Sequence, residues 1–471
     1  MVKVRTRKIN QGLTEGSLRS SIWRLALPMM TGLLLQDLFS LADLFFVGRL
    51  GHIAVAALSI SGAIIAVIMM AAIGISAGTT ALIAHFAGKK DYSSADNVLF
   101  QTILVSLACS IAMALIGLFG TDMLLRIFGA TPEIMPQATG YLKINFIFSI
   151  TIFLFIALNQ ALRGCGDALT PLKILVLTNL LNIALDPLLI FGIGFFPRLE
   201  VAGSAAATVI SRGLGVIILL GHLLFGYSSL HLHKGSLKIN LLLIGRMIKI
   251  GFFASFEVLL RQLSMLLLLR LVASFGAACL AGYGIAMRLR MALMMLGFGM
   301  GSASSTIIGQ NMGAAIPQRA VKSGWKALKY YQLIAAPFAL LFLMLSPQVI
   351  GLFNDNPRVL EIGATFLRFI ALGFPFLAST LILGRGISDA GDTLAAAVMT
   401  GIAHLVLRVP LAYALVRLFG LDSNAIWLAI TFTDILQGLA MVWYFKKGLW
   451  QKRYQRHRAI LEQGSVIPDY N

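Results

Sequence analysis

Charged residues are scarce in this chain, and acidic residues are the scarcest of them. Only 12% of the 471 residues are Asp, Glu, Lys or Arg, and 19 acidic residues stand against 38 basic ones. Soluble domains carry about 25% charged and about 45–50% apolar residues, whereas this chain is 58% hydrophobic. The composition therefore excludes an ordinary soluble domain and predicts a polytopic membrane protein.

Several catalytic and metal-binding motifs are also missing. The sequence contains no G-x-x-x-x-G-K-[ST] loop for ATP and no H-E-x-x-H zinc motif. Cys109, Cys165 and Cys279 lie far apart without metal-ligand spacing, so we interpret them as buried apolar residues. The hydrolase-like G-x-S-x-G pattern at Gly74–Gly78 lies inside an apolar run, where we expect a helix-packing face rather than a strand-to-helix elbow. We therefore expect that the protein is not an enzyme and has no cofactor.

Long apolar segments dominate the remaining sequence. Each is continuous and long enough for a spanning helix, which needs about 20 residues, and none shows the short alternating pattern of a membrane β-barrel. The predicted fold class is an all-α polytopic membrane protein with twelve transmembrane helices. The predicted spans are 21–47, 54–86, 97–120, 136–162, 171–196, 201–226, 244–274, 279–309, 326–353, 362–388, 394–419 and 425–445.

The basic residues of the loops predict the orientation. If the N-terminus is cytoplasmic, most loop and tail Lys and Arg residues face the cytoplasm, as such proteins prefer. The opposite side receives far fewer: Arg49, Arg126, Arg198, Arg358 and Arg417. We therefore expect a multi-pass protein of the plasma (bacterial inner) membrane with both termini cytoplasmic. This bias also explains the net charge of +19 without a nucleic-acid partner.

The two halves of the chain resemble each other. Gly74–Gly88 is similar to Gly299–Gly313, and the Arg163-Gly164 region is similar to the Arg385-Gly386 region. This repeat predicts two pseudo-symmetric six-helix lobes of the same orientation, an arrangement typical of transporters. The predicted parts are an N-terminal tail at 1–20, an N-lobe at 21–230, a linker at 231–243, a C-lobe at 244–446 and a basic tail at 447–471.

Acidic residues inside apolar spans are the strongest functional signal in the first half. Asp43 lies in the first predicted span, and Asn182 and Asp186 lie four residues apart on one face of the fifth. Carboxylates at membrane depth usually face a cavity and mark an ion path or a proton relay. Oxygen ligands of this kind suit a hard cation, so Na⁺ at Asp43, Asn182 and Asp186 is one interpretation. Two neighbouring carboxylates that share a proton are the other.

The second half contains a weaker candidate site. Glu257 and Arg261 are spaced for an i,i+4 ion pair, which is either functional or purely structural. His404 and Arg408 are also four residues apart, and Arg408 either anchors a helix end or neutralises an acid. Asp37, which lies on a different face of the first span from Asp43, has no assigned role.

Several segments together resemble the MATE family of multidrug and toxic compound extrusion transporters. They are LADLFFVGRLG, IAHFAGKKDYSSA, ALRGCGDALTPLKI, NLLNIALDP, GRGISDAGDTLAAA and LRVPLAYAL, which cover nearly the whole chain in the family's order. The resemblance implies two six-helix lobes and export of cationic or amphipathic compounds in exchange for H⁺ or Na⁺ by alternating access.

The resemblance also implies which residues bind the coupling ion. An acidic cluster in the N-lobe matches Asp43, Asn182 and Asp186, and a threonine of the sixth span matches Thr208 or Ser204. Glu257 matches an acid that another branch pairs with an aspartate upstream of its second R-G motif. Here that stretch, GFPFLASTLILGRG, has no acid. We therefore favour the N-lobe site over a second-lobe site at Glu257, Arg261 and Arg408.

The sequence is compatible with two functions. The first is a secondary active multidrug antiporter, expected to be a monomer in contact with membrane lipids and small-molecule substrates. The second is a flippase for a lipid-linked precursor, from the same broad superfamily, which would require a cationic groove. Arg261, Arg288, Arg290 and Arg408 are available for such a groove, but the N-lobe acids fit cation coupling better. A membrane enzyme lacks a nucleophile–base pair, and a channel suits the unequal repeats less well than alternating access.

Overall fold

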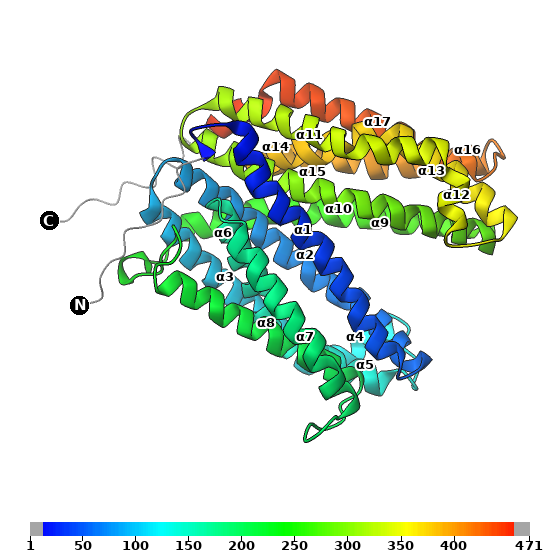
Figure 1. Ribbon diagram of the computed structural model, residues 1–471, viewed down its shortest axis with the longest axis horizontal. Helices are drawn as coiled ribbons and strands as arrows, with labels where there is room; N and C mark the ends of the chain where they lie inside the picture. The colour runs from blue at the N-terminus through cyan, green and yellow to red at the C-terminus, as the bar shows by residue number, and fades with distance from the viewer. Residues whose placement is uncertain (1–12, 456–471) are drawn as a thin grey trace. The chain divides into compact units, whose positions relative to one another are not determined.

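The computed structural model describes residues 13–455, which fold into helices joined by short connections, with no strand among them (Figure 1). Contacts divide the chain into two compact units. The first unit contains Thr31–Phe252, and the second contains Gly16–Met30 and the chain from Phe253 onward. The first and the seventh predicted spans therefore each contribute residues to both units. The fold class predicted from the sequence, an all-α polytopic membrane protein, is confirmed.

Eleven helices among the described residues are long and apolar enough to cross a membrane. A twelfth span is a pair of helices, Met135–Ile147 and Ser149–Gly164, bent by 51° at their junction. With this pair counted as one span, each of the twelve predicted segments has its counterpart.

The helices that begin in the first half are α1 (Leu18–Gly48), α2 (His52–Gly88), α3 (Tyr92–Phe119), α4 (Thr121–Ile127), α5 (Met135–Ile147), α6 (Ser149–Gly164), α7 (Leu169–Phe191) and α8 (Val201–Leu224). A short 3₁₀ turn, η2 (Lys234–Ser236), follows. The second half contains α9 (Leu241–Ala273), α10 (Ala277–Gly313), α11 (Pro317–Met344), α12 (Ser346–Gly351), α13 (Pro357–Ser379), η3 (Thr380–Gly384), α14 (Arg385–Asp389), α15 (Thr393–Gly401), η4 (Ile402–Arg408), α16 (Val409–Arg417) and α17 (Asn424–Lys447).

The internal repeat is visible in the lengths of the helices. Helices α2 and α10 both contain 37 residues, and the helices that follow them, α3 and α11, both contain 28. The halves differ where the first has the bend between α5 and α6. The corresponding place in the second half lies within α13, which continues without a break into η3, a π-helical segment. Insertions of this kind are frequent at functional sites.

Glycines allow the closest helix contacts in each unit. A Cβ atom at Gly78 of α2 would lie 2.5 Å from the carbonyl oxygen of Met247 in α9, and one at Gly251 would lie 2.6 Å from that of Gly74. In the second unit, a Cβ atom at Gly299 of α10 would lie 2.7 Å from Met30 Cα. Only glycine fits these positions, so the G-x-S-x-G pattern is a helix-packing face, as predicted.

Loops at the ends of the helices are held by specific polar contacts. Asp392 precedes α15 and accepts a hydrogen bond from the backbone N–H of Ala395 at 3.4 Å, which caps the helix. The same carboxylate accepts hydrogen bonds from the Tyr444 hydroxyl and, at 2.9 Å, from Arg453 Nη1. The hydrogen bond to Asp392 raises the pKa of Arg453 above its ordinary value. The second R-G…D segment thus fastens α15 to the end of α17.

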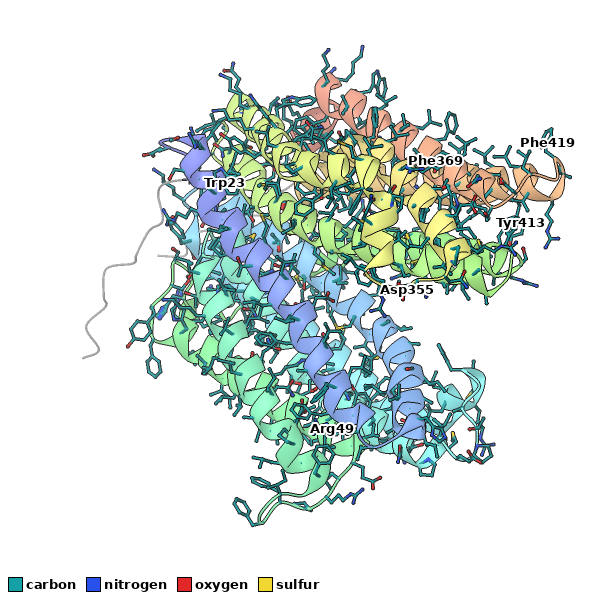
Figure 2. The ribbon with its side chains drawn as sticks, turned by 45° about the vertical axis from the view of Figure 1, so that its right-hand side comes forward. Trp23, Arg49, Asp355, Phe369, Tyr413 and Phe419 are labelled. Carbon is teal, nitrogen blue, oxygen red and sulfur yellow. The ribbon has the colours of Figure 1, made fainter. Side chains whose placement is uncertain are left out.

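Aromatic side chains form part of the core of the second unit. Tyr283, Phe366 and Trp427 stack on one another, with ring centroids of Phe366 and Trp427 4.1 Å apart. In the first unit, Arg49 follows α1 (Figure 2). Its guanidinium lies 4.5 Å from the centre of the Phe45 ring.

Candidate functional site

The first unit brings together the acidic and amide side chains that the sequence singled out. Asp43 comes from α1, Asn182 and Asp186 come from α7, and Thr208 comes from α8. Asn182 Nδ2 lies 3.4 Å from Asp186 Oδ1 and 3.5 Å from Thr208 Oγ1. The carboxyl groups of Asp43 and Asp186 are direct neighbours. One turn of helix separates Asn182 from Asp186 and lets a single amide contact both α7 and α8.

Two oxygen atoms of this cluster lack a hydrogen-bond donor in the described part of the chain. They are Asp43 Oδ1 and Asp186 Oδ2, both buried. The Asp186 side chain has no exposed surface. A buried carboxylate oxygen without a partner is costly, so the pair is suited to hold a proton or a hard cation. Ser204, the alternative to Thr208, is fully buried, and its hydroxyl has no partner among the described residues.

Two further residues belong to the surroundings of this cluster and were not predicted. Tyr141 of α5 interacts electrostatically with Asp43, Asp186 and Arg212, and Arg212 of α8 interacts with Asp43. Arg212 could have been singled out from the sequence, because it is an arginine in the middle of an apolar span. No feature of the sequence distinguishes Tyr141 from the other tyrosines, because only the fold brings α5 beside α8.

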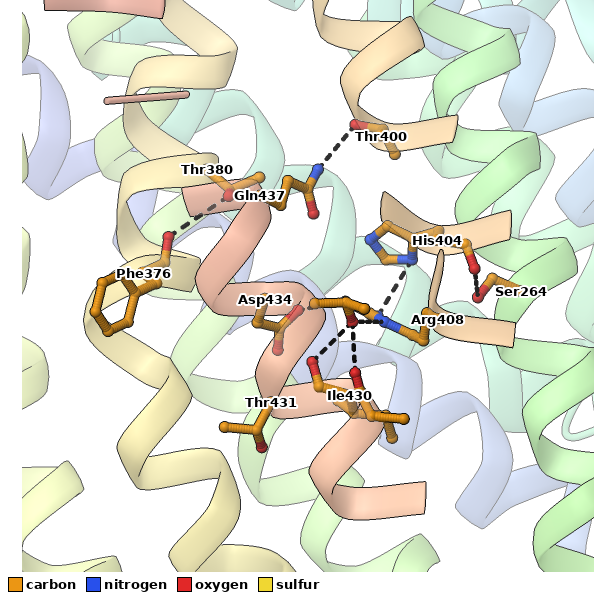
Figure 3. A network of polar contacts seen from close by, with 12 residues as sticks. Ser264, Phe376, Thr380, Thr400, His404, Arg408, Ile430, Thr431, Asp434 and Gln437 are labelled. Atoms are coloured by element: carbon orange, nitrogen blue, oxygen red, sulfur yellow. Dashed lines mark hydrogen bonds and ion pairs between the residues drawn. The ribbon is translucent and has the colours of Figure 1, made fainter. Parts of the chain in front are cut away.

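The second unit contains a different cluster, centred on a carboxylate that was not predicted from the sequence. Asp434 of α17 accepts a hydrogen bond from Arg290 Nη2 of α10 at 2.7 Å and one from Arg408 Nη2 at 2.5 Å. All three side chains are almost fully buried. Arg408 also donates from Nε to Thr433 at 2.7 Å and lies 3.2 Å from His404 Nδ1 (Figure 3). Arg408 therefore neutralises an acid, which is one of its two predicted roles.

The predicted pair of Glu257 and Arg261 forms, at 2.7 Å, on a partly exposed face of α9. Arg408 directs its guanidinium to Asp434, Thr433 and His404, and it interacts electrostatically with Arg261. Gln437 donates to Thr400 at 3.1 Å (Figure 3). Thr400 in turn donates to Glu257 at 3.3 Å. These polar contacts run from the surface of α9 toward α17, which carries Asp434.

The set of polar side chains in the first unit differs from that of a transition-metal site. Among residues 13–455, no three His, Cys, Asp or Glu side chains gather as a metal ion of that kind would require. Two carboxylates, an amide and a hydroxyl instead offer hard oxygen ligands or a shared proton. Asp37, on the same helix as Asp43, is exposed and outside this cluster.

These observations define a polytopic helical membrane protein made of two homologous halves with a polar cluster in each. The family model MatE matches residues 28–188 and again residues 254–414, once in each half. The chain belongs to the MatE (MATE) family of membrane transporters, so it is a transporter and not an enzyme.

The chain is similar to known members over almost its whole length. It is 27% identical to the probable multidrug resistance protein NorM of Thermotoga maritima, over 93% of this chain and 94% of that protein. It is 26% identical to the FAD transporter of Shewanella oneidensis, over 92% and 95%. A solved structure described as MATE in the bent conformation matches with a TM-score of 0.88 and 24% identity, over 96% of this chain and 100% of that one.

Proposed function

We propose that this transporter is a secondary active multidrug efflux antiporter, which exports cationic or amphipathic organic compounds in exchange for H⁺ or Na⁺. The similarity to proteins named for multidrug resistance supports the cargo. The absence of a P-loop from the sequence favours an ion gradient over ATP as the energy source. The observation that carries the proposal is the pair of neighbouring carboxylates, Asp43 and Asp186, inside membrane spans.

The net charge of the cluster suggests how many coupling ions bind to it. Two carboxylates, Asp43 and Asp186, face one arginine, Arg212. The three groups together carry one negative charge in excess, which a single H⁺ or a single Na⁺ neutralises. Because unbalanced charge in a membrane interior is costly, the cluster has a clear preference for being loaded with one cation.

The residues of the cluster have two roles in this mechanism. Asp43 and Asp186 bind the coupling ion through their unpartnered oxygens. Asn182 contacts both Asp186 and Thr208, so Asn182 and Thr208 together orient the site. Asp43 lies on α1, and Asp186 lies beside Pro187 on α7, so loading the site links two helices. A ligand shifts a conformational equilibrium only through different affinities for the two states, and we propose alternating access by such a shift.

The expected setting is the bacterial inner membrane, with both termini in the cytoplasm and the transporter acting as a monomer among lipids. The distribution of loop Lys and Arg residues supports this orientation. Arg49, which follows α1, would then face the outside.

The test is ethidium efflux from liposomes that contain the purified full-length chain, with a pH gradient or a Na⁺ gradient imposed separately. The proposal predicts dye movement against its concentration gradient with one of the two ions, and that ion is then the coupling ion. Protein-free liposomes and liposomes without a gradient are the controls. Dye that moves with neither gradient would contradict multidrug antiport.

A lipid-linked precursor flippase remains the second candidate because buried arginines are present in the second unit. Arg290 and Arg408 already share Asp434, which weakens the case for a strongly cationic groove. A fluorescent lipid-linked pyrophosphate in the same liposomes distinguishes the two. Its protein-dependent movement, together with no gradient-driven ethidium efflux, would favour the flippase.

A further inference from the structure

The buried cluster around Asp434 has more positive than negative charge. Arg290 and Arg408 bind the two oxygens of one carboxylate, and the three side chains are 6%, 5% and 3% exposed. The ion pair on α9, Glu257 with Arg261, is neutral by itself. One positive charge therefore remains uncompensated in the core of the second unit, and burial of such a charge is costly.

The histidine beside the cluster does not offset this excess. His404 Nδ1 lies 3.2 Å from Arg408 Nη1, and a guanidinium has only donors, so Nδ1 is the acceptor. The ring is thus neutral, with its proton on Nε2. His404 and Arg408 are held on η4, a π-helical segment of seven residues. π-Helical insertions mark functional sites more often than ordinary helix does.

The guanidinium of Arg290 makes fewer hydrogen bonds than that of Arg408. Arg408 uses all three of its nitrogens, on Thr433, His404 and Asp434. Arg290 donates to Asp434 from Nη2, whereas its Nε and Nη1 donate to no other side chain or carbonyl among residues 13–455. A guanidinium can bind a carboxylate or a phosphate through two parallel N–H groups, and Arg290 keeps two nitrogens free for such a partner.

The surface beside Arg290 is apolar and adaptable. Met287 and Met294 lie one helical turn from Arg290 on the same face of α10, and Met291, the residue after Arg290, lies about 100° around the helix. Met291 is exposed and Met287 is half-buried, so the methionines extend from the arginine to the surface of the unit. Methionines fit apolar bodies of varied shape, and a cation at their buried end fits an acidic group on such a body.

We propose that Arg290 binds the carboxylate or phosphate of an amphipathic organic substrate, with Met287, Met291 and Met294 against its apolar part. This inference rests on the proposed function for transport, and it adds compounds that carry an acidic group to the amphipathic substrates of that function. When substrate is absent, the Asp434 carboxylate accepts a hydrogen bond from Arg290 and so competes with the acidic group of the substrate for the guanidinium.

Binding is tested by isothermal titration calorimetry on the purified full-length protein in detergent. The three probes are 1-naphthyl phosphate, 1-naphthylmethylammonium and inorganic phosphate. The first two share the ring and differ in charge, and the third has the charge without the ring. The proposal predicts saturable binding of 1-naphthyl phosphate that neither other probe reproduces or displaces at equal concentration. Equal binding of inorganic phosphate would overturn the assignment to an organic substrate.

Two substitutions with opposite expected effects separate an anion site from a structural ion pair. Arg290→Gln should weaken naphthyl phosphate binding by about tenfold to a hundredfold, the loss of a charge-assisted contact. Asp434→Asn removes the competitor and should strengthen binding. Arg288→Gln, an exposed arginine on the same helix, is the matched control and should leave binding unchanged.

A purely structural cluster would give no such pattern. Arg290→Gln with unchanged naphthyl phosphate affinity in a protein of wild-type thermal stability would overturn the proposal. If Asp434→Asn does not fold, the naphthyl phosphate affinities of Arg290→Gln and Arg290→Lys are compared instead. Only the lysine variant keeps the positive charge. Calorimetry needs no ion gradient, so a protein that binds the anion but does not couple to H⁺ or Na⁺ would refute the antiport and leave this site standing.

Discussion

Arg290 and Arg408, which lie on helices far apart in the sequence, bind opposite oxygens of the single carboxylate of Asp434. Arg290 Nη2 contacts Oδ2 at 2.7 Å, and Arg408 Nη2 contacts Oδ1 at 2.5 Å. The carboxylate therefore joins α10, η4 and α17 at one buried point. The first unit has the opposite balance, because Asp43 and Asp186 face one arginine, Arg212.

Loss of Asp434 should be far more destabilising than loss of Arg290. Asp434→Leu leaves two buried guanidinium groups without a counter-charge and should lower the free energy of unfolding by about 3–5 kcal/mol. Arg290→Leu leaves Asp434 neutralised by Arg408, so we expect a change near zero. Thermal unfolding of the purified variants in one detergent measures their stabilities relative to wild type. Arg288→Leu, at an exposed position, should stay within about 0.5 kcal/mol of wild type. Equal losses for Asp434→Leu and Arg290→Leu would contradict the shared-carboxylate geometry.

Two glycines of α2, Gly78 and Gly62, should differ in how an alanine substitution changes the stability of the protein. Gly78→Ala would place a Cβ atom 2.5 Å from the carbonyl oxygen of Met247, so we expect a loss of about 1–3 kcal/mol. A Cβ atom at Gly62 would meet no neighbouring helix or side chain within 4 Å, so Gly62→Ala should be neutral or stabilising by up to about 1 kcal/mol. Thermal unfolding again provides the readout, and a Gly78→Ala protein as stable as Gly62→Ala would refute the close contact.

Arg212 should set the affinity for the coupling ion. Arg212→Gln removes a positive charge beside Asp43, so an incoming cation meets less repulsion at the carboxylate pair. We expect the H⁺ or Na⁺ concentration that gives half-maximal efflux to fall by roughly tenfold. Arg270→Gln, an exposed arginine of α9, should not change it. An unchanged or higher half-maximal concentration for Arg212→Gln would show that this arginine does not belong to the ion site.

The helices and their repeat could be predicted from the sequence because hydrocarbon imposes long apolar runs. The predicted similarity of Gly74–Gly88 to Gly299–Gly313 corresponds to the ends of α2 and α10, which have equal lengths. The contact between Asn182 and Asp186 likewise followed from their spacing, because a single helix determines it.

Contacts between helices could not be predicted in the same way. Asp434 is a visible acid in an apolar span, yet its partners lie 144 and 26 residues away, and no spacing rule connects them. For the same reason the sequence placed Arg408 with Glu257 and Arg261 but did not show its direct partner, Asp434. The π-helical segments η3 and η4 depend on packing around them rather than on a local residue pattern.

The coupling role of Asp43 is the claim on which the mechanism depends. Ethidium efflux should be compared in liposomes that contain wild type, Asp43→Asn or Asp37→Asn, under the gradient that drives the wild type. Asp37 lies on the same helix and is exposed. Asp37→Asn therefore removes the same charge as Asp43→Asn but lies outside the site. Loss of driven efflux in Asp43→Asn alone, with normal folding, is the predicted result. Wild-type efflux by Asp43→Asn would contradict a coupling site at Asp43 and Asp186.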